Sequence, residues 1–451
     1  MLSARLKQAW ASVAERGRAL LHPRRSGPSA NNIESLALDL LSERGEATSM
    51  ARADAIARLY GSLSKEQRAL FHLFLAVNFL PESTRLKAAA KAYLNAPSAE
   101  TVAELAVASE PPRQELIRRM NVAPGATGLL VRMREELLAG LETQPQLRPL
   151  EQDLRSLLAS WFNRGFLTLK RIDWTSSAAV LEKVIAYEAV HEIRGWDDLR
   201  RRLAPDRRCF AFFHPALPEE PLIFVEVALC QGLASEIAPL LSANAPADDP
   251  AQADTAIFYS ISNCQPGLRG ISFGNFLIKQ VVEELRAELP GLKRFATLSP
   301  VPGFKRWLNK QGLDGNESEL PGGSLDINWA TAERANPAIK TALLRLLAKY
   351  LTASNDGKGP DDPVARFHLG NGARLERLNW AANLSPKGIG ESLGMMVNYL
   401  YEPKTIDDNH EQFVVAGRVA CSTEIEDLLR RPARAGNGKT NGREQKATSP
   451  S

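Results

Sequence analysis

The chain changes character near Gly165, and this change constrains its fold more than any other feature. Before that point, apolar residues recur at helical spacing and no strand-like run occurs. The clearest helical stripe consists of Leu129, Leu130, Met133, Leu137, Leu138 and Leu141. After Gly165 come short, β-rich apolar runs, of which four stand out: GFLTLKRIDW (165–174), LIFVEVAL (222–229), TAIFYSIS (255–262) and FATLSP (295–300). The sequence therefore predicts a helical region followed by a mixed α/β region.

Prolines divide the first region into several helices joined by short turns. The breaks are expected where a helix cannot continue, at Pro81, Pro97, Pro111 to Pro112, Pro124 to Gly125, and Pro145. The region carries many apolar stripes but no cluster of nucleophile, base and anion-binding loop. We therefore expect a helical bundle that assembles the chain into a homo-oligomer with closed symmetry.

Four segments follow from these patterns. Residues 1–30 form a flexible or helical lead, 31–165 the helical bundle, 166–430 the mixed α/β domain, and 431–451 a disordered tail. The tail is rich in Gly, Asn, Lys, Arg, Ser and Pro and has no apolar periodicity. A length of 451 residues agrees with two main domains.

Composition and charge narrow the function classes. Hydrophobic residues make up 44% of the chain, which is typical of a globular protein with a sizeable core. The net charge of +4 is small beside 56 basic and 52 acidic residues, and the basic residues are spread along the chain. Nucleic-acid binding is therefore not expected, whereas the mild positive balance suits an anionic small molecule.

Other features bear on location. No window holds 18 uninterrupted apolar residues, so no membrane-spanning helix is predicted. The four cysteines lie far apart, without a zinc-binding pair or a dense disulfide pattern, which indicates a reducing compartment. The Arg-rich start lacks the apolar core of a secretory signal. We expect a cytoplasmic protein, with the mitochondrial matrix as the alternative because transit peptides are also basic and amphipathic.

The most informative stretch runs from Ala256 to Trp307 and reads as strand, glycine-rich loop, helix from about Asn275, and second strand. Free backbone N–H groups where a loop enters a helix suit a pyrophosphate. The candidate residues are Arg269, Gly270, Ile271, Ser272, Phe273, Gly274 and Asn275. Their glycine spacing matches neither the dinucleotide fingerprint nor the P-loop, so a tight turn with a helix cap explains them equally well.

The layout of this stretch is similar to the acyl-CoA N-acetyltransferase superfamily, which places the CoA pyrophosphate at such a turn. The superfamily's usual loop, [Q/R]-x-x-G-x-[G/A], is not reproduced, because Arg269, Gly270 and Gly274 are spaced differently. The resemblance is therefore one of layout.

Five strings read together are more specific. They are FFHPALPEEPLIFVEVAL (212–229), FYSISNCQPGLRGISFGNFLIK (258–279), LSPVPGFKRWL (298–308), FHLGNGARLERLNW (367–380) and GMMVNYLY (394–401). They closely resemble malonyl-CoA decarboxylases, occur in that family's order and cover nearly the whole second half. The helical half agrees with the family's N-terminal domain in type only. The resemblance implies a catalytic, CoA-binding domain over 166–430.

The resemblance also implies an activity and its residues. The family converts malonyl-CoA to acetyl-CoA and carbon dioxide, with a catalytic serine in L-S-P-x-P-G-F and a catalytic histidine in F-H-L-x-N-G-A. These motifs fall on Ser299 and His368, which implies that the serine accepts a proton and the histidine donates one.

The residue types suit that chemistry. Loss of carbon dioxide from a malonyl thioester leaves an enolate whose charge sits on the thioester oxygen, so no metal or organic cofactor is expected. Histidine has the ordinary pKa closest to neutrality, so His368 can deliver a proton and recover it from water. Ser299 is expected at a strand end, where ligands of α/β units commonly bind.

Other residues are weaker candidates. Tyr401 could donate a hydrogen bond near the thioester or the carboxylate, although aromatic residues in such a run usually belong to the core. Gly370, Asn371 and Gly372 form a turn signal that would set the direction of His368.

Two other functions remain open at this stage. One is an acyl-CoA-dependent acyltransferase, because the loop alone would serve either reaction. The other is a non-catalytic malonyl-CoA sensor that signals through its helical half. The motifs around Ser299 and His368 favour the decarboxylase.

Overall fold

The computed structural model describes residues 30–42, 45–271, 276–311, 337–353 and 359–430. Within them the chain forms two compact units. The first contains residues up to Ala228, residues 246–250 and Ser260–Pro290; the second contains Leu229–Ala245, Ala251–Tyr259 and the described residues from Gly291 onward. The expected lead (1–30, apart from Ala30) and tail (431–451) lie outside the described residues.

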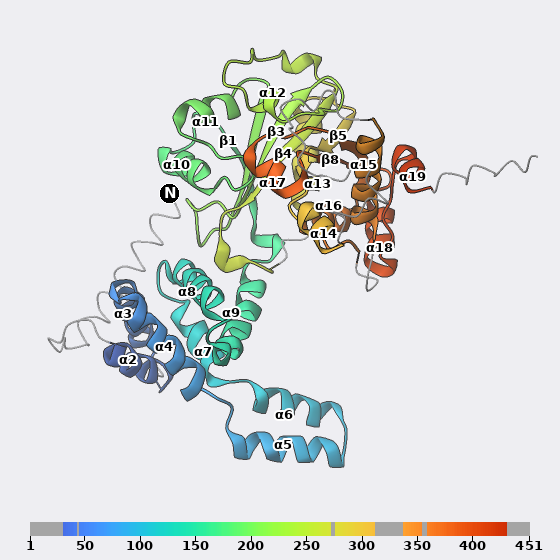
Figure 1. The fold of residues 1–451 in the computed structure, drawn as a ribbon. Coiled ribbons are helices and arrows are strands. Elements are labelled where there is room, and N and C mark those ends of the chain that lie inside the picture. Colours follow the sequence, from blue (N-terminus) through green and yellow to red (C-terminus); the bar gives the residue numbers. More distant parts are fainter. Residues whose placement is uncertain (1–29, 43–44, 272–275, 312–336, 354–358, 431–451) are drawn as a thin grey trace, which may run out of the picture. The chain divides into compact units, whose positions relative to one another are not determined.

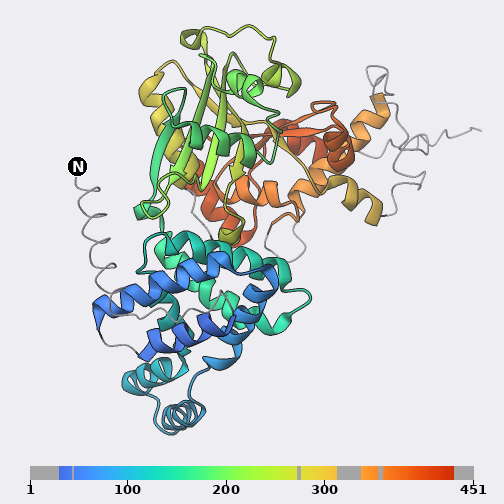
Figure 2. The ribbon, with the colours of Figure 1, turned by 90° about the vertical axis from the view of Figure 1, so that its left-hand side faces the viewer.

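The first unit begins with helices only, as predicted, shown in blue to teal in Figures 1 and 2. They are α2 Ala30–Ser42, α3 Glu46–Ser62, α4 Lys65–Asn78, α5 Ser83–Asn95, α6 Ala99–Ser109, α7 Pro112–Met120, α8 Ala126–Gly140 and α9 Arg148–Trp161. The predicted proline breaks fall between these helices or at their starts. Gly125, with φ of 77°, directly precedes α8, a conformation that glycine adopts without strain.

The predicted apolar stripe is the buried face of α8. Leu129, Leu130, Met133 and Leu137 are buried and join the core of the helical region. Leu141, just past the end of α8, packs against the same core while partly exposed. The helices therefore owe their packing to the periodicity seen in the sequence.

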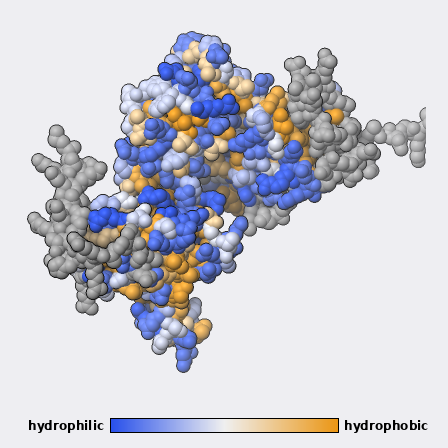
Figure 3. Space-filling view, turned by 60° about the vertical axis from the view of Figure 1, so that its left-hand side comes forward, coloured by the Kyte–Doolittle hydropathy of each residue, from blue (hydrophilic) through white to orange (hydrophobic). Residues whose placement is uncertain are grey.

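The hairpin of α5 and α6 exposes apolar side chains, among them Leu94, Val102 and Val107. Apolar residues (orange) also appear over the helical region on the face drawn in Figure 3. Such a surface supports the expected homo-oligomer, which stays a prediction.

Among the described residues, the mixed α/β region forms one sheet of eight strands, which confirms the predicted fold class. The strands are β1 Thr168–Ile172, β2 Arg207–Phe213, β3 Ile223–Cys230, β4 Thr255–Asn263, β5 Arg294–Thr297, β6 Ser299–Pro300, β7 Arg374–Asn379 and β8 Met396–Leu400. Their order is β1-β2-β3-β4-β5-β8-β6, with β7 paired to β8. The four predicted runs correspond to β1, β3, β4 and the pair β5 and β6, whereas β2, β7 and β8 were not identified.

The sheet is mixed in direction. Strands β1, β2 and β3 pair antiparallel, β4 and β5 pair parallel, and β8 runs antiparallel to β5, β6 and β7. The parallel pair is joined through α13, Phe276–Glu288, which gives the predicted order of strand, loop, helix and strand. This order places the end of β5, and with it Ser299, at a carboxyl edge of the sheet.

Further helices complete the region. They are α10 Ala178–Tyr187, α11 Trp196–Arg202, α12 Ala238–Leu241, α14 Phe304–Lys310, α15 Pro337–Thr352, α16 Pro363–Gly370, α17 Pro386–Ser392, α18 Ile406–Ala416 and α19 Thr423–Leu429. Among the described residues no helix is long and apolar enough to cross a membrane. Cys209, Cys230, Cys264 and Cys421, all among the described residues, form no disulfide bond.

Candidate active site

Ser299 lies in the short strand β6, two residues beyond the end of β5. It pairs with Val397 of β8 and is buried. Its hydroxyl donates a hydrogen bond of 2.9 Å to Thr297 Oγ1, which in turn accepts a bond of 3.1 Å from the Tyr399 backbone N–H. The serine oxygen is therefore held in place from the sheet side.

His368 lies in the last turn of α16 and is buried against this serine. Its Nε2 is 3.0 Å from Ser299 Oγ, and its Nδ1 is 2.7 Å from the Tyr401 hydroxyl. The imidazole stacks on the Tyr399 ring, with centroids 4.7 Å apart and an interplanar angle of 24°. The structure thus brings together three residues singled out from the sequence: Ser299, His368 and Tyr401.

The C-terminal end of α16 fixes the direction of the histidine. Gly372 has φ of 81°, and a Cβ there would overlap the Ile406 carbonyl oxygen, so the turn requires glycine. The Ala373 N–H donates to the His368 carbonyl at 3.1 Å. The predicted turn after His368 is therefore confirmed, as a helix end of the usual left-handed kind.

The N-terminal end of α16 depends on Asp362, which is fully buried. Its Oδ1 accepts hydrogen bonds of 3.0 Å from the Val364 and Ala365 N–H groups, as a helix N-cap does. Its Oδ2 faces the Gly303 N–H at 3.4 Å and the Tyr350 hydroxyl at 3.3 Å. Because Gly303 lies in the turn after Ser299, one carboxylate connects the serine's turn to the histidine's helix.

Strand β8 supplies the remaining contacts. Side chains two residues apart on a strand share a face, so Tyr399 and Tyr401 both reach His368. Asn398, the residue before Tyr399, donates to the Thr297 carbonyl at 2.7 Å and accepts from Asn379 Nδ2 at 2.8 Å. These bonds tie β8 to the end of β5 and to β7.

Burial sets the protonation state of the site. It lowers the pKa of His368 to about 3 and raises the pKa of Tyr401 and Tyr399 well above its usual range. The imidazole is therefore neutral at physiological pH, and the expected ionisation of free His368 near neutrality was wrong. Burial also raises the pKa of Asp362.

The hydrogen bonds select one tautomer of the neutral histidine. Tyr401 keeps its proton and donates to Nδ1, so the ring proton is on Nε2 and points at Ser299 Oγ. Ser299 in turn donates to Thr297. This assignment gives each group in the chain a donor or acceptor that fits.

The candidate anion-binding loop is described in part. Ser272, Phe273, Gly274 and Asn275 lie outside the described residues. Arg269 and Gly270 are exposed, and Ile271 is buried. Gly270 has φ of 78°, a backbone conformation that side-chain-bearing residues rarely adopt.

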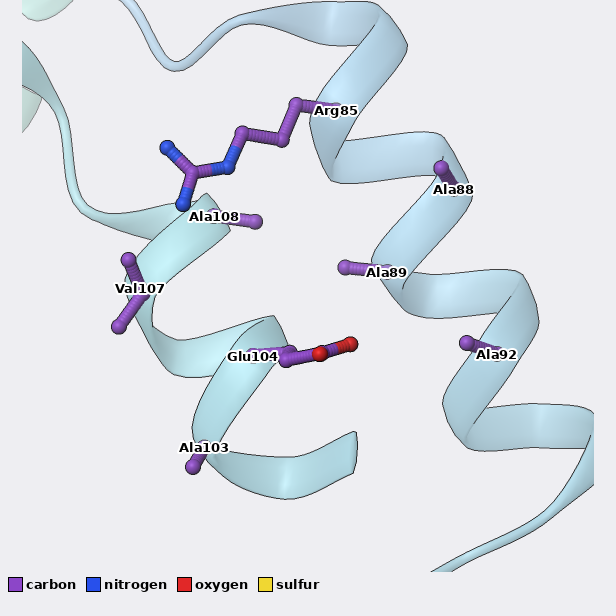
Figure 4. A pocket seen from close by; sticks show the side chains of 8 residues that line it. All are labelled: Arg85, Ala88, Ala89, Ala92, Ala103, Glu104, Val107 and Ala108. Carbon is purple, nitrogen blue, oxygen red and sulfur yellow. The ribbon is translucent and has the colours of Figure 1, made fainter. Parts of the chain in front are cut away.

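A separate pocket of about 620 Å³ lies between α5 and α6 (Figure 4). Its lining consists of Arg85, Glu104, Val107 and alanines, with no histidine, serine or cysteine. It therefore lacks the serine and histidine that meet at the candidate active site. Among the described residues, no group of three or more His, Cys, Asp or Glu side chains is arranged to hold a metal ion.

Sequence reasoning missed Thr297, Tyr350, Asp362, Asn398 and Tyr399. Only Asp362 had a readable signal, because an Asp before a Pro marks the start of a helix. The others act through partners far away along the chain, which their local sequence does not indicate.

Comparisons with known proteins agree with this fold. Two family profiles match: the malonyl-CoA decarboxylase C-terminal domain over residues 165–438 and the malonyl-CoA decarboxylase N-terminal domain over 79–162. The chain belongs to the malonyl-CoA decarboxylase family. As a member of this family it is a carboxy-lyase.

Relatives within the malonyl-CoA decarboxylase family cover most of the chain. The mitochondrial malonyl-CoA decarboxylase of Anser anser anser is 36% identical over 346 residues, 70% of this chain and 69% of the relative. The crystal structure of malonyl-CoA decarboxylase from Rhodopseudomonas palustris is 48% identical, covers 88% of this chain and 99% of its own, and has a TM-score of 0.83. That from Agrobacterium vitis is 50% identical, covers 89% and 100%, and has a TM-score of 0.81.

The two oxygens of Asp362 allow a test of what holds the site. Asp362→Asn keeps an acceptor for the helix cap but loses the acceptor that faces Gly303. We expect it to lower kcat at least tenfold, because displacements of about 1 Å at an active site can cost about a hundredfold. Stability against urea should fall less than in Asp362→Ala, which also loses the cap, worth about 1 kcal/mol. Turnover is measured with malonyl-CoA, the substrate in the relatives' names.

The matched control is Ser422→Ala, which removes the N-cap of α19. It should reduce stability in the same way and leave kcat near the parental value. Parental kcat in a folded Asp362→Asn protein would show that the link between the two segments is not needed.

Proposed function

We propose that the chain decarboxylates malonyl-CoA to acetyl-CoA and carbon dioxide, with His368 as proton donor and Ser299 assisting. The observation that carries the proposal is the buried chain of hydrogen bonds from Thr297 through Ser299 and His368 to Tyr401. It aligns a neutral imidazole with a hydroxyl group at the carboxyl edge of β5. Family membership favours this reaction over acyl transfer or ligand sensing.

The reaction balances without an added cofactor. The bond between the carboxylate carbon and the α-carbon breaks, carbon dioxide leaves, and the electron pair remains as a thioester enolate. A proton from His368 then forms the methyl group of acetyl-CoA. Solvent returns one proton to the histidine, so each turnover consumes one proton.

The substrate itself supplies the charge that His368 needs. In the free protein burial holds the pKa of His368 at about 3, so the ring is neutral and lacks the second proton of the imidazolium form. A carboxylate about 4 Å away attracts the imidazolium by about 4 kcal/mol at an effective dielectric constant of about 20, roughly a thousandfold in the protonation equilibrium. Malonyl-CoA binding and proton uptake are therefore coupled. When carbon dioxide leaves, the imidazolium of His368 stabilises the enolate in place of the carboxylate.

Ser299 and Tyr401 are the hydrogen-bond partners of the two ring nitrogens of His368. Ser299 Oγ accepts a hydrogen bond from Nε2–H in the free protein and releases it when the substrate takes over as acceptor. Tyr401 can donate to a neutral Nδ1 and accept from a protonated one. We therefore propose Tyr401 as a positioning residue for His368, in place of the substrate contact considered from sequence.

The remaining assignments are part of the same proposal. Residues Arg269 to Asn275 bind the CoA pyrophosphate, and the helical region forms the homo-oligomer. The relatives named above include a mitochondrial protein; for this chain we propose the cytoplasm, with the mitochondrial matrix as the alternative.

The reaction itself is tested with pure protein, malonyl-CoA, a chelator and no amine. We expect acetyl-CoA and carbon dioxide in equal amounts. Turnover that begins only after an amine is added would identify an acyltransferase instead, and malonyl-CoA that stays bound and unchanged for hours would identify a sensor. Activity lost in chelator and restored by a divalent ion would refute the metal-free chemistry.

The two central residues should act as a unit. His368→Asn is expected to lower kcat by a factor of about 10² to 10⁴, the usual contribution of a positioned general acid, with little change in malonyl-CoA binding. Ser299→Ala should also lower kcat, and the double variant should be hardly slower than the slower single one. His214→Asn is the control, because His214 contacts the Trp161 backbone carbonyl and neither catalytic residue. Full activity in folded His368→Asn would move the proton donor elsewhere.

The pH dependence follows from the lowered pKa of His368. Since the ring must gain a proton on substrate binding, kcat/KM should fall as pH rises through neutrality, by up to tenfold per pH unit. Tyr401→Phe removes the acceptor for the protonated Nδ1, so it should lower kcat and shift the falling limb of kcat toward lower pH. A flat profile between pH 6 and 9, or an unshifted limb in Tyr401→Phe, would contradict the coupling.

A further inference from the structure

The loop assigned to CoA is held by the helical region of its own unit. Arg134, in α8, donates hydrogen bonds to the Gly267 carbonyl at 2.6 Å and to the Arg269 carbonyl at 2.9 Å. Its side chain is 2% exposed. One buried guanidinium therefore binds two carbonyl oxygens of a loop more than 130 residues away in sequence.

A buried ion pair keeps Arg134 in this position. Glu151 of α9 accepts from both Nε and Nη2 of Arg134, at 3.0 and 2.7 Å, which leaves Nη1 for the Gly267 carbonyl. Burying two charges is costly and is compensated only when the geometry and the remaining hydrogen bonds are good. Here the remaining N–H donors of the guanidinium bind carbonyl oxygens of the loop. The loop backbone therefore supplies the hydrogen bonds that the buried ion pair needs.

Two further contacts hold the loop against α8 and α9. Arg155 of α9 donates to the Gly270 carbonyl at 3.2 Å and is exposed. At Gly267 a Cβ would overlap the Val131 carbonyl oxygen of α8. The loop backbone is therefore packed on the helix backbone, with no room for a side chain.

Fixing the carbonyl oxygens also fixes the amides. In a trans peptide the C=O and the next N–H point in opposite directions, so the Gly270 N–H is directed away from the Arg269 carbonyl that Arg134 holds. The amides of Leu268, Arg269 and Ile271 are used inside the loop. Gly270 N–H has no hydrogen-bond partner among the residues that the structure describes.

We propose that Arg134 and Arg155 are positioning residues for CoA binding. By holding the carbonyls of Gly267, Arg269 and Gly270 on the helical side, they direct the Gly270 amide toward the pyrophosphate. The helical region is then part of the substrate-binding apparatus and not only a means of assembly. This inference rests on the proposed assignment of the loop to CoA.

The first experiment uses Arg155→Ala, which changes an exposed side chain. KM for malonyl-CoA should rise about three- to tenfold, the worth of one hydrogen bond, while kcat stays within about twofold. Malonyl-pantetheine has the same reacting thioester but no pyrophosphate, so its kcat/KM should not change. Arg155→Lys should restore part of the affinity, and Arg148→Ala, an exposed arginine on the same helix, should match the parent.

The second variant is Arg134→Lys, which keeps a cation for Glu151 but cannot span both carbonyls. In folded protein it should show the same separation, with a raised KM for malonyl-CoA and unchanged kcat/KM for malonyl-pantetheine. A parental KM for malonyl-CoA in Arg155→Ala and Arg134→Lys overturns the inference. So does an equal loss for both substrates, because a general structural role would not distinguish them.

Gly270→Val separates this inference from the assignment on which it rests. A bulky residue there obstructs the loop whether or not the arginines position it. If Gly270→Val raises KM for malonyl-CoA while the arginine variants do not, the loop binds CoA without help from the helices. If none of the three variants changes KM, the loop itself has been misassigned, and the decarboxylation chemistry at Ser299 and His368 is unaffected.

Discussion

His368 is buried with a hydroxyl group on each ring nitrogen, and the site depends on this arrangement. Removing an imidazole from water is tolerable when both nitrogens keep hydrogen-bond partners, and Ser299 and Tyr401 provide them. Burial then destabilises the charged imidazolium more than the neutral ring, and this lowers the pKa of His368 to about 3. A site of this kind rests uncharged.

The partners of the histidine come from segments that the sheet brings together. Strand β8 pairs with β5, β6 and β7, so it touches the strand that ends beside Ser299 and presents Tyr399 and Tyr401 to His368. Asn398, the residue before Tyr399, holds β8 to the Thr297 carbonyl. Asp362 adds a link outside the sheet by capping α16 and facing Gly303. Rigid strands and a capped helix thus set the donor and acceptor positions.

The loop assigned to CoA is also held by polar contacts with specific partners. Charged side chains of α8 and α9 bind backbone carbonyls of the loop, so the direction of its amides depends on helices distant in sequence. In both sites a buried polar group is matched to specific partners, because an unmatched one would cost more than the fold gains. In this chain the helical region therefore also holds the backbone of the loop.

The sequence alone determined the helical region and the mixed α/β region, and its resemblance to a known family singled out Ser299 and His368 as candidates. Helical periodicity and proline positions are local properties, and the motif strings carry the two residues directly. Strands β2, β7 and β8 were not predicted, because brief apolar runs do not distinguish a strand from a buried helix segment. Only the tertiary structure decided that Tyr401 binds His368, that Asp362 joins two active-site segments, that Arg134 holds the loop, and that the histidine rests neutral. Each of these depends on burial or on partners separated by tens of residues along the chain, and neither is written in local sequence spacing.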